Sequence, residues 1–316
     1  MKRRNIYREV TEAIVKALRK GVGPWIKPWR TSPVERYDGP VGPHRNAFSG
    51  RAYRGINILL LNLASMKRGF SSNLWLTYDE AGKLKGYVRQ GEKGTKIIFW
   101  NFVEIEIRDR YGNPIVDPET GEPLKKTVPF ARVYTVFNLE QTRGVKLPQR
   151  VGKRCERDRK NDLGERLLAL PRIVWGNKAA YYPVRDFIEL PPRSAFRTLE
   201  HFYATAFHEI IHWTGHPSRA DRDLSGRFGD KVYAFEELIA EMGAAFLGAH
   251  AGLPIKRLRH PEYINDWIRI LEEDRTYRAI FRAARLAQEA CNWLLERVSA
   301  ETEDSDHTEC EMREAA

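Results

Sequence analysis

The sequence predicts an α+β protein, in which a mixed α+β half is followed by a mainly helical half with a small sheet. Strand-like runs of β-branched and aromatic residues lie mainly in the first half, whereas long segments with apolar residues three to four positions apart dominate the second. Charge divides at the same place. Residues 1–160 contain 33 Lys and Arg against 16 Asp and Glu, a charge of +17, whereas residues 161–316 contain 20 against 26, a charge of −6. The overall charge of +11 therefore combines two unlike halves.

In the first half, helical segments come before strands. Apolar spacing predicts two amphipathic helices, and Thr77 with Glu80 forms a capping-box pattern that begins a third, shorter helix. These helices are expected at 5–20, 55–67 and 77–84. Runs of β-branched and aromatic residues predict strands at 86–88, 96–107 and 128–137.

In the second half, two short strands come before long helices. Strands are expected at 173–175 and 186–190, and helices at about 196–213, 232–250, 261–272 and 276–298. The acidic end lacks apolar periodicity and is predicted to be disordered. We therefore expect a basic domain over 1–145, a basic linker over 146–165, a second domain over 166–299 and a disordered acidic tail over 300–316.

Cysteine usage and hydropathy favour a cytoplasmic protein. Cys155, Cys291 and Cys310 are odd in number and widely spaced, which argues against a disulfide framework or a cysteine metal site. The longest apolar stretch, residues 56–64, is far too short to span a bilayer, and no apolar signal-peptide core follows the basic N-terminus. We expect no membrane association.

The basic half has the composition of a surface for single-stranded DNA. Bases stack on aromatic rings while cations follow the backbone, and here aromatic residues alternate with Lys and Arg. The flexible turn 91–96 could offer backbone N–H groups and lysines to phosphate. Core packing better explains Trp75 and Trp100, whereas Trp25 and Trp29 stand among prolines and cations. The residues predicted to contact DNA are Trp25, Lys27, Trp29, Arg30, Tyr53, Arg54, Arg89, Lys93 and Lys96.

The most specific pattern is H-E-x-x-H at residues 208–212, on a segment predicted to be helical. Residues four apart share one helix face, so His208 and His212 can bind one cation. Neutral imidazoles suit Zn²⁺, so one zinc ion per chain is predicted, with Glu209 as the catalytic base that takes a proton from water. Two surface histidines beside a solvated glutamate are the alternative interpretation.

The third metal ligand is expected on the next helix. Ser218 occupies the position where the longer H-E-x-x-H-x-x-G-x-x-H pattern needs histidine, and the direction of His216 beyond Gly215 is open. Glu237 and Glu241 lie four apart beside an apolar stripe, where carboxylates are costly unless they are paired or bound to metal.

We assign Glu237 as the third ligand and Glu241 as the acceptor for a histidine N–H, most simply that of His208. Exchanged roles for these two carboxylates remain open, as does a solvated face carrying both. Glu236 is expected to face solvent. The predicted strand at 186–190 could be an edge strand that pairs with a peptide substrate, although a buried structural strand would explain the same residues.

Taken together, these motifs resemble the ArdC-type antirestriction proteins of mobile genetic elements. The similarity runs from about residue 5 to residue 298 and keeps the motif order, although segment 141–165 is more basic than expected for the family and the acidic tail is unfamiliar. The motifs are at 53–57, 75–77, 88–94, 136–138, 190–192, 206–216, 222–224 and 236–241.

The resemblance implies an N-terminal domain that binds single-stranded DNA and a C-terminal zincin-like metallopeptidase domain. It implies a metal held by His208, His212 and Glu237, and protection of incoming DNA from host restriction. Two alternatives stay open. The chain could be a DNA-tethered zinc metalloprotease that cleaves DNA-bound proteins such as restriction-system components. It could instead be a DNA-binding protein whose metal site is purely structural.

Overall fold

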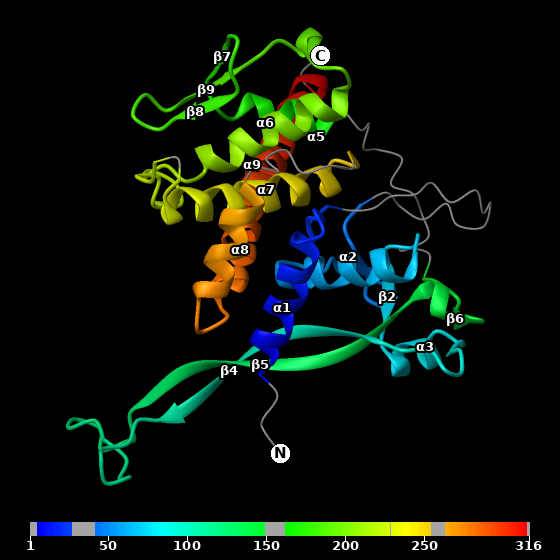
Figure 1. Ribbon diagram of the computed structural model, residues 1–316, viewed down its shortest axis with the longest axis vertical. Coiled ribbons are helices and arrows are strands. Elements are labelled where there is room, and N and C mark those ends of the chain that lie inside the picture. Colours follow the sequence, from blue (N-terminus) through cyan, green and yellow to red (C-terminus); the bar gives the residue numbers. More distant parts are fainter. Residues whose placement is uncertain (1–4, 27–41, 149–161, 228, 254–262, 315–316) are drawn as a thin grey trace.

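The computed structural model describes residues 5–26, 42–148, 162–227, 229–253 and 263–314, and it confirms the α+β class (Figure 1). Its helices are α1 (Ile6–Leu18), α2 (Ile56–Arg68), α3 (Tyr78–Lys83), α5 (Asp162–Ala169), α6 (Leu199–Trp213), α7 (Lys231–His250), α8 (Ile264–Glu273) and α9 (Ala279–Glu314). Its strands are β1 (Arg45–Asn46), β2 (Leu74–Leu76), β3 (Tyr87–Val88), β4 (Thr95–Glu106), β5 (Lys125–Asn138), β6 (Thr142–Arg143), β7 (Ile173–Trp175), β8 (Ala180–Tyr182) and β9 (Phe187–Leu190).

The first half is built around a sheet with strand order β1-β2-β5-β4. The antiparallel pair β4 and β5 continues beyond this sheet as a long two-stranded ribbon that extends away from the helices (Figure 1). Trp75 on β2 is fully buried, as predicted. Trp100 is not, because it lies on β4 where the ribbon leaves the core, and 41% of it is exposed.

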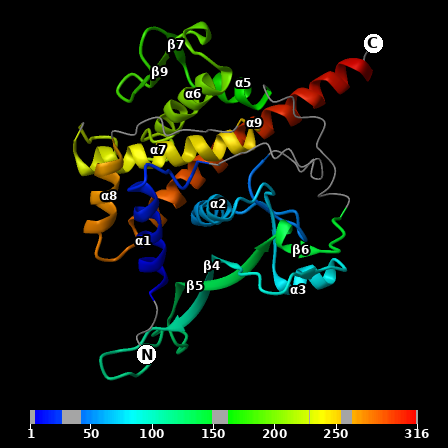
Figure 2. The same ribbon diagram turned by 45° about the vertical axis from the view of Figure 1, so that its right-hand side comes forward.

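The two halves share one hydrophobic cluster. Helix α1 packs on α8, and α2 packs on α9 and on β4. Ile14 of α1, Leu59 of α2 and Phe246 of α7 belong to the same set of buried residues. Figure 2 shows α1 and α2 lying against the long C-terminal helices. The change of charge near residue 160 therefore does not divide the hydrophobic core.

Two boundaries differ from the sequence-based expectation. Helix α5 begins at Asp162, inside the predicted linker, while residues 149–161 of that linker lie outside the described part of the chain. Helix α9 continues to Glu314, where a disordered tail was predicted, and its end projects from the body in Figure 2. Residues 279–314 contain no Gly or Pro and many strong helix formers, so nothing in the local sequence ends the helix.

No helix in the described part of the chain has the length and apolar character needed to cross a bilayer.

Close packing of α6 on α7 sets the position of the H-E-x-x-H segment. A side chain at Gly243 of α7 would place its Cβ 2.7 Å from the Cδ1 and Cγ1 atoms of Ile211 on α6. Glycine is therefore required for this approach, which brings the predicted ligands on the two helices together.

Substitution Gly243→Val is expected to lower the free energy of unfolding by about 1–3 kcal/mol, because it overpacks this contact. Thermal unfolding followed by fluorescence would measure the change. Gly82→Ala is the matched control, since a Cβ at Gly82 of α3 meets no atom within 4 Å. An unchanged melting temperature for Gly243→Val would contradict the packing argument.

Candidate metal centre and cleft

The metal-binding segment lies in the second half of α6, a helix in which most residues are buried. Thr198 forms its N-cap, and the Thr198 hydroxyl oxygen accepts a hydrogen bond from the backbone N–H of His201. The apolar stripe of α6 packs into the core and faces α7 across the Gly243 contact. Both histidines therefore project from a rigid element toward the neighbouring helix.

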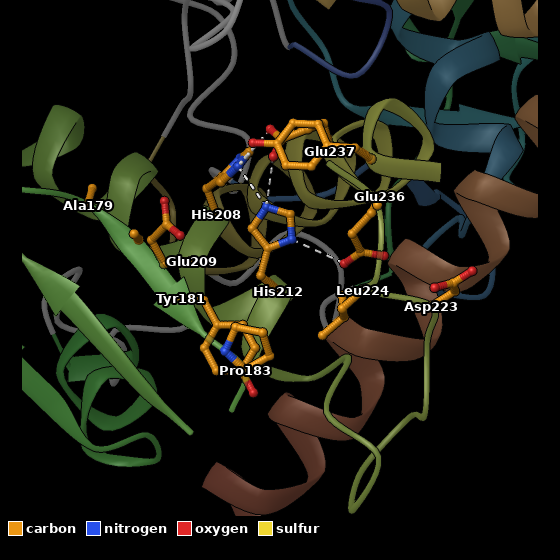
Figure 3. Close-up of a pocket in the computed structure, with 13 residues that line it drawn as sticks. Ala179, Tyr181, Pro183, His208, Glu209, His212, Asp223, Leu224, Glu236 and Glu237 are labelled. Atoms are coloured by element: carbon orange, nitrogen blue, oxygen red, sulfur yellow. Dashed lines mark hydrogen bonds and ion pairs between the residues drawn. The ribbon is translucent and has the colours of Figure 1, made fainter. Parts of the chain in front are cut away.

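Two imidazoles and one carboxylate converge between α6 and α7 (Figure 3). The Nε2 atoms of His208 and His212 lie 3.1 Å apart. The Glu237 carboxylate places Oε2 3.4 Å from His208 Nε2 and Oε1 3.4 Å from His212 Nε2. Ligand atoms of all three residues lie within 4.8 Å of one another, so they can hold a metal ion. The spatial grouping agrees with the predicted ligand set.

Glu209 lies beside this group and lines the same cleft. It is 5% exposed, so it is held near the ligands in a largely dry environment. In Figure 3 its carboxylate lies on the side of His208 that faces Ala179. This position is suitable for a proton acceptor next to a metal, although the catalytic role itself stays a prediction.

The predicted solvent-facing position of Glu236 is wrong. Glu236 is buried, and its Oε1 accepts a hydrogen bond from His212 Nδ1 at 3.1 Å. Arg222 donates to both oxygens of Glu236, from Nε at 3.0 Å and from Nη2 at 2.8 Å. The same guanidinium donates to the backbone carbonyl of Ile211 at 2.6 Å and to the hydroxyl of Thr214 at 2.9 Å.

This network fixes the orientation of one metal-binding imidazole. Because Nδ1 of His212 is held by Glu236, its Nε2 is directed toward Glu237 and the candidate metal position. Arg222 was not predicted as a site residue, and its only signal in the sequence is its position in the short segment 222–224 shared with the ArdC family. A buried carboxylate next to a ligand histidine needs a cation, and Arg222 supplies it.

Two other predicted candidates are placed differently. His216 hydrogen-bonds Ser218, with 2.8 Å from Nδ1 to Oγ, and it does not belong to the ligand group. Glu241 is buried one helical turn beyond Glu237, on the same helix. Its predicted role as acceptor for His208 stays a prediction.

In the metal-free site, the pKa shifts favour an ionised Glu237 carboxylate and a protonated His212 imidazole. Burial raises the pKa of Glu237, but hydrogen bonds from His208 and His212 outweigh it and hold that pKa well below its usual range. Burial lowers the pKa of His212, but hydrogen bonds to Glu236 and Glu237 outweigh it and raise that pKa to about 10. At neutral pH the metal-free His212 is therefore a cation between two carboxylates.

Metal binding is expected to release a proton from His212, because only the neutral imidazole is a ligand. The raised pKa means that protons compete with metal at all pH values below about 10. Apparent metal affinity should thus rise by about tenfold per pH unit from pH 7 upward. Calorimetric zinc titrations in buffers of different protonation enthalpy would count the protons.

Glu236→Gln provides the comparison, because it removes one of the two carboxylates that stabilise the cation. A smaller proton release is expected in that variant. An affinity independent of pH between 7 and 9 in the wild-type protein would contradict the assigned charge state.

A cleft of about 290 Å³ opens onto the ligand group. One wall is formed by His208, Glu209 and His212, and the opposite wall by β8 and its flanks, including Ala180, Tyr181 and Pro183. The three-stranded sheet has the order β7-β9-β8, so the strand at 187–190 is central and β8 is an outer strand. Of the two interpretations of 186–190, the edge strand is wrong and the structural strand is confirmed, because β7 and β8 pair with both of its sides.

A second arginine, Arg219, whose side chain is only 9% exposed, connects β8 to the end of α6. Arg219 forms an ion pair with Asp186 and donates from Nε to the backbone carbonyl of Trp213 at 2.7 Å. The Tyr181 hydroxyl donates to Asp186 at 2.9 Å and accepts from Arg219 at 3.3 Å. The outer strand is thereby held at a fixed distance from the ligand histidines. No motif in the sequence indicates this contact.

Two of the predicted DNA-contact residues that the structure describes, Trp25 and Tyr53, are buried rather than on a surface. Trp25 is 2% exposed and packs edge-on against Trp267, with 5.5 Å between ring centroids, and Tyr53 is 6% exposed. Neither ring presents a face for stacking, because both are used in the core. Lys27, Trp29 and Arg30 lie outside the described residues. The remaining predicted cations, Arg54, Arg89, Lys93 and Lys96, are exposed.

Comparisons with known proteins match both halves of the chain. Residues 4–137 match the family model of the N-terminal domain of the anti-restriction factor ArdC, and residues 167–286 match that of the zincin-like metallopeptidase. A DNA primase TraC of Escherichia coli is 36% identical over 299 residues, which are 92% of this chain and 27% of that protein. A second TraC primase of the same organism is 36% identical over 90% of this chain and 19% of its own length. The chain therefore spans about a quarter or less of these primases.

Full-length similarity is found with other proteins. The uncharacterized protein y4eC of Sinorhizobium fredii is 34% identical over 315 residues, which are 99% of this chain and 96% of that protein. The metal-free crystal structure of the antirestriction protein ArdC from plasmid R388 superimposes with a TM-score of 0.73 at 36% identity, covering 94% of this chain and 99% of that one. The Mn(II)-bound structure of the R388 protein gives 0.70 at 34% identity, covering 93% and 98%. The chain therefore belongs to the ArdC antirestriction family, with an N-terminal ArdC domain and a C-terminal zincin-like metallopeptidase domain.

Proposed function

We propose that this chain is a zinc-dependent peptidase that is delivered to single-stranded DNA by its basic half, where it protects entering DNA from restriction. The observation that carries the proposal is the arrangement of the cleft. The ligand group His208, His212 and Glu237 lies at its base, Glu209 lies beside the ligands, and the outer strand β8 forms the opposite wall. These are the parts that metal-assisted hydrolysis of a polypeptide requires.

The chemistry of the donor set suits a divalent transition metal. Two imidazole nitrogens and one carboxylate oxygen converge in a buried position, and this set is typical of catalytic zinc sites that leave a further position open. The R388 relative has been crystallised with Mn(II), so a member of this family accepts a divalent ion. Zinc is the ion we propose for this chain. When bound, it would polarise the substrate carbonyl and make water more acidic.

The residues of the chain have separate tasks in this proposal. Glu209 takes the proton from the attacking water and then delivers it to the leaving amine. Glu236, held by Arg222, keeps His212 in the tautomer whose Nε2 faces the metal position. The core packing of α6 on α7 excludes water from behind the ligands. Tyr233 lines the same cleft and accepts a hydrogen bond at 3.4 Å from the hydroxyl of Tyr263, which sets the direction of its phenol.

The substrate that fits this cleft is an extended polypeptide. Within the described part of the chain, strand β8 pairs with β9 alone, and Ala180 of β8 lines the cleft. An extended chain can add to such a strand by main-chain hydrogen bonds, which require no particular side chains. Proteins of restriction systems bound to single-stranded DNA are the substrates we propose, because the basic half would bring the peptidase to the same strand.

The test is a cleavage assay on DNA-bound protein. Purified restriction-system subunits are incubated with the zinc-loaded chain, with and without single-stranded DNA, and fragments are followed by mass spectrometry. We expect DNA-dependent cleavage that a chelator abolishes and added zinc restores. If chelation lowers the melting temperature but leaves protection of DNA from restriction unchanged, the metal is structural and the peptidase proposal fails.

A further inference from the structure

We propose that the single-stranded nucleic acid binds on the exposed face of the small ladder formed by β3 and β6, together with the adjoining turn that follows α3. This inference rests on the proposed DNA-binding function and names its surface. The residues that carry it are Lys83, Lys85, Tyr87, Arg89, Arg143 and Lys146, which we call the tyrosine–lysine surface.

The ladder places one aromatic ring between cations. Tyr87 and Arg143 are direct cross-strand partners, so their side chains lie on the same face. Arg89 lies two residues beyond Tyr87, and its backbone N–H bonds the carbonyl of Gln141, which continues the ladder. Alternation along the strand returns Arg89 to the face of Tyr87. All three are exposed, and Tyr87 is exposed by 58%.

The base beneath this face is rigid. Val88, on the opposite face of the ladder, packs on the buried cluster that contains Ala81 of α3. Helix α3 is fixed by a complete capping box between Thr77 and Glu80. A Cβ at Gly86 would lie 2.5 Å from Val145, so the ladder and the turn are in close contact. The surface is therefore preorganised, which lowers the ordering cost of binding.

Three nearby carboxylates, those of Glu80, Glu92 and Glu140, are engaged within the protein, whereas Asp79 in the first turn of α3 is exposed. Glu80 accepts from Asn46 and from the backbone N–H of Thr77, and Glu140 accepts from the backbone N–H groups of Ser71 and Ser72. Glu92 accepts from Gln141 and from Arg89.

By contrast, four cations of this surface are not paired with any carboxylate that the structure describes, and one of them, Lys83, has its ammonium over the ring of Phe48, 5.7 Å from the centroid. Among the described residues, no ion pair involves Lys83, Lys85, Arg143 or Lys146. All four are exposed. Their positive charge is complementary to a polyanion.

The exposed ring selects the kind of polyanion. Tyr87 offers a phenol face on which an unpaired base can stack, whereas bases in a duplex have no free face. The flanking guanidinium groups and lysines can meet the phosphates on either side. Tyr78, at the start of the neighbouring helix α3, is 65% exposed and offers a second aromatic ring. An acidic peptide would use the cations but not the rings.

The long ribbon of β4 and β5 carries exposed aromatic residues as well, but its charges are mixed. Its free end, residues 104–126, contains four Lys and Arg against six Asp and Glu. A polyanion is therefore favoured on the tyrosine–lysine surface rather than at the ribbon end.

The test uses the full-length chain and a labelled oligothymidylate, with affinity measured by fluorescence anisotropy over a range of salt concentrations. Tyr87→Ala is expected to weaken binding by about 5- to 150-fold, the effect of losing one stacked base. Tyr87→Phe keeps the ring and should bind like wild type. The double variant Arg143→Ala/Lys146→Ala should make the slope of log affinity against log salt shallower by about 0.7 for each phosphate that the protein no longer neutralises.

The matched controls lie on the ribbon. Tyr111→Ala removes a ring that is 74% exposed, and Lys125→Ala/Lys126→Ala removes two exposed cations, so both should leave affinity unchanged. If wild type binds oligothymidylate but the surface variants match these controls, the inference is overturned while the proposed DNA binding stands. Equal loss in Tyr87→Phe and Tyr87→Ala, or equal affinity for polyglutamate, also overturns it. If wild type binds no oligothymidylate, the proposed DNA binding itself fails.

Discussion

Replacing Glu209 by glutamine is expected to lower peptidase turnover by about 10²- to 10⁴-fold, the usual contribution of a general base. Glutamine keeps the size of the side chain and its hydrogen-bonding oxygen, but it cannot take a proton. Glu209 is not in the ligand group of His208, His212 and Glu237. Metal content, thermal stability and affinity for single-stranded DNA should therefore be unchanged.

A second glutamate on the same helix gives the matched control for this experiment. Glu200 lies in the first turn of α6 and is exposed, so Glu200→Gln changes the charge of the helix without reaching the cleft. Wild-type turnover is expected for Glu200→Gln. Both variants would be compared for cleavage of a DNA-bound protein and for protection of DNA from restriction in cells.

Protection in cells separates the two halves of the proposed function. If Glu209→Gln loses cleavage and protection together, proteolysis is the mechanism of protection. If the variant binds metal and DNA normally and still protects fully, coating of the strand is sufficient and the peptidase proposal is overturned. The family membership of the chain is unaffected by either result, because it rests on similarity along the whole sequence.

The candidate metal centre could be predicted from the sequence because it depends on local spacing. His208 and His212 share a helix face through the 3.6-residue repeat alone, and the burial of Glu237 follows from the apolar stripe around it. The close packing of α6 on α7 depends on Gly243, where a Cβ would lie 2.7 Å from Ile211. For these residues, the helical spacing in the sequence is sufficient to predict their positions in the fold.

The network around the ligands could not be predicted, because it depends on distant contacts. Glu236 is adjacent to Glu237 and was expected to face solvent, yet it is buried by Arg222, fourteen residues earlier in a loop. The outer position of β8 follows from the order of three short strands, which no single segment encodes. Loop-to-helix ion pairs and strand order are therefore visible only in the folded chain.

The predicted DNA contacts failed at Trp25 and Tyr53 for a different reason. Trp25 has prolines and a lysine as neighbours and Tyr53 has arginines, which is typical of exposed loops, but a large ring also stabilises the fold when it is buried. Trp25 closes the cluster shared by α1 and α8, and Tyr53 packs with Trp75 and Ile97. Aromatic residues that alternate with cations indicate that this half of the chain binds nucleic acid. They do not identify which aromatic rings are exposed in the folded protein.

The identity of the third ligand is tested by comparing Glu237→Ala with Glu241→Ala. The two carboxylates lie one turn apart on α7 and are similarly buried, at 5% and 3% exposure. The structural cost of each truncation should therefore be similar, and a difference in metal affinity would reflect the ligand role. Glu237 brings one oxygen within 3.4 Å of each histidine Nε2, a position no other described carboxylate shares.

Glu237→Ala is expected to weaken zinc binding by more than about 100-fold, because it leaves two imidazoles as the only ligands from the chain, whereas loss of an outer hydrogen-bond partner typically costs about 10- to 100-fold. Glu241→Ala should stay within that smaller range and keep metal after purification. Zinc titrations with a competing chromophoric chelator measure both affinities, and circular dichroism checks the fold. A metal-loaded Glu237→Ala protein beside a metal-free Glu241→Ala protein would exchange the two roles. In that case α7 would have to rotate on binding metal, because in the present arrangement Glu237 is the carboxylate that faces both histidines.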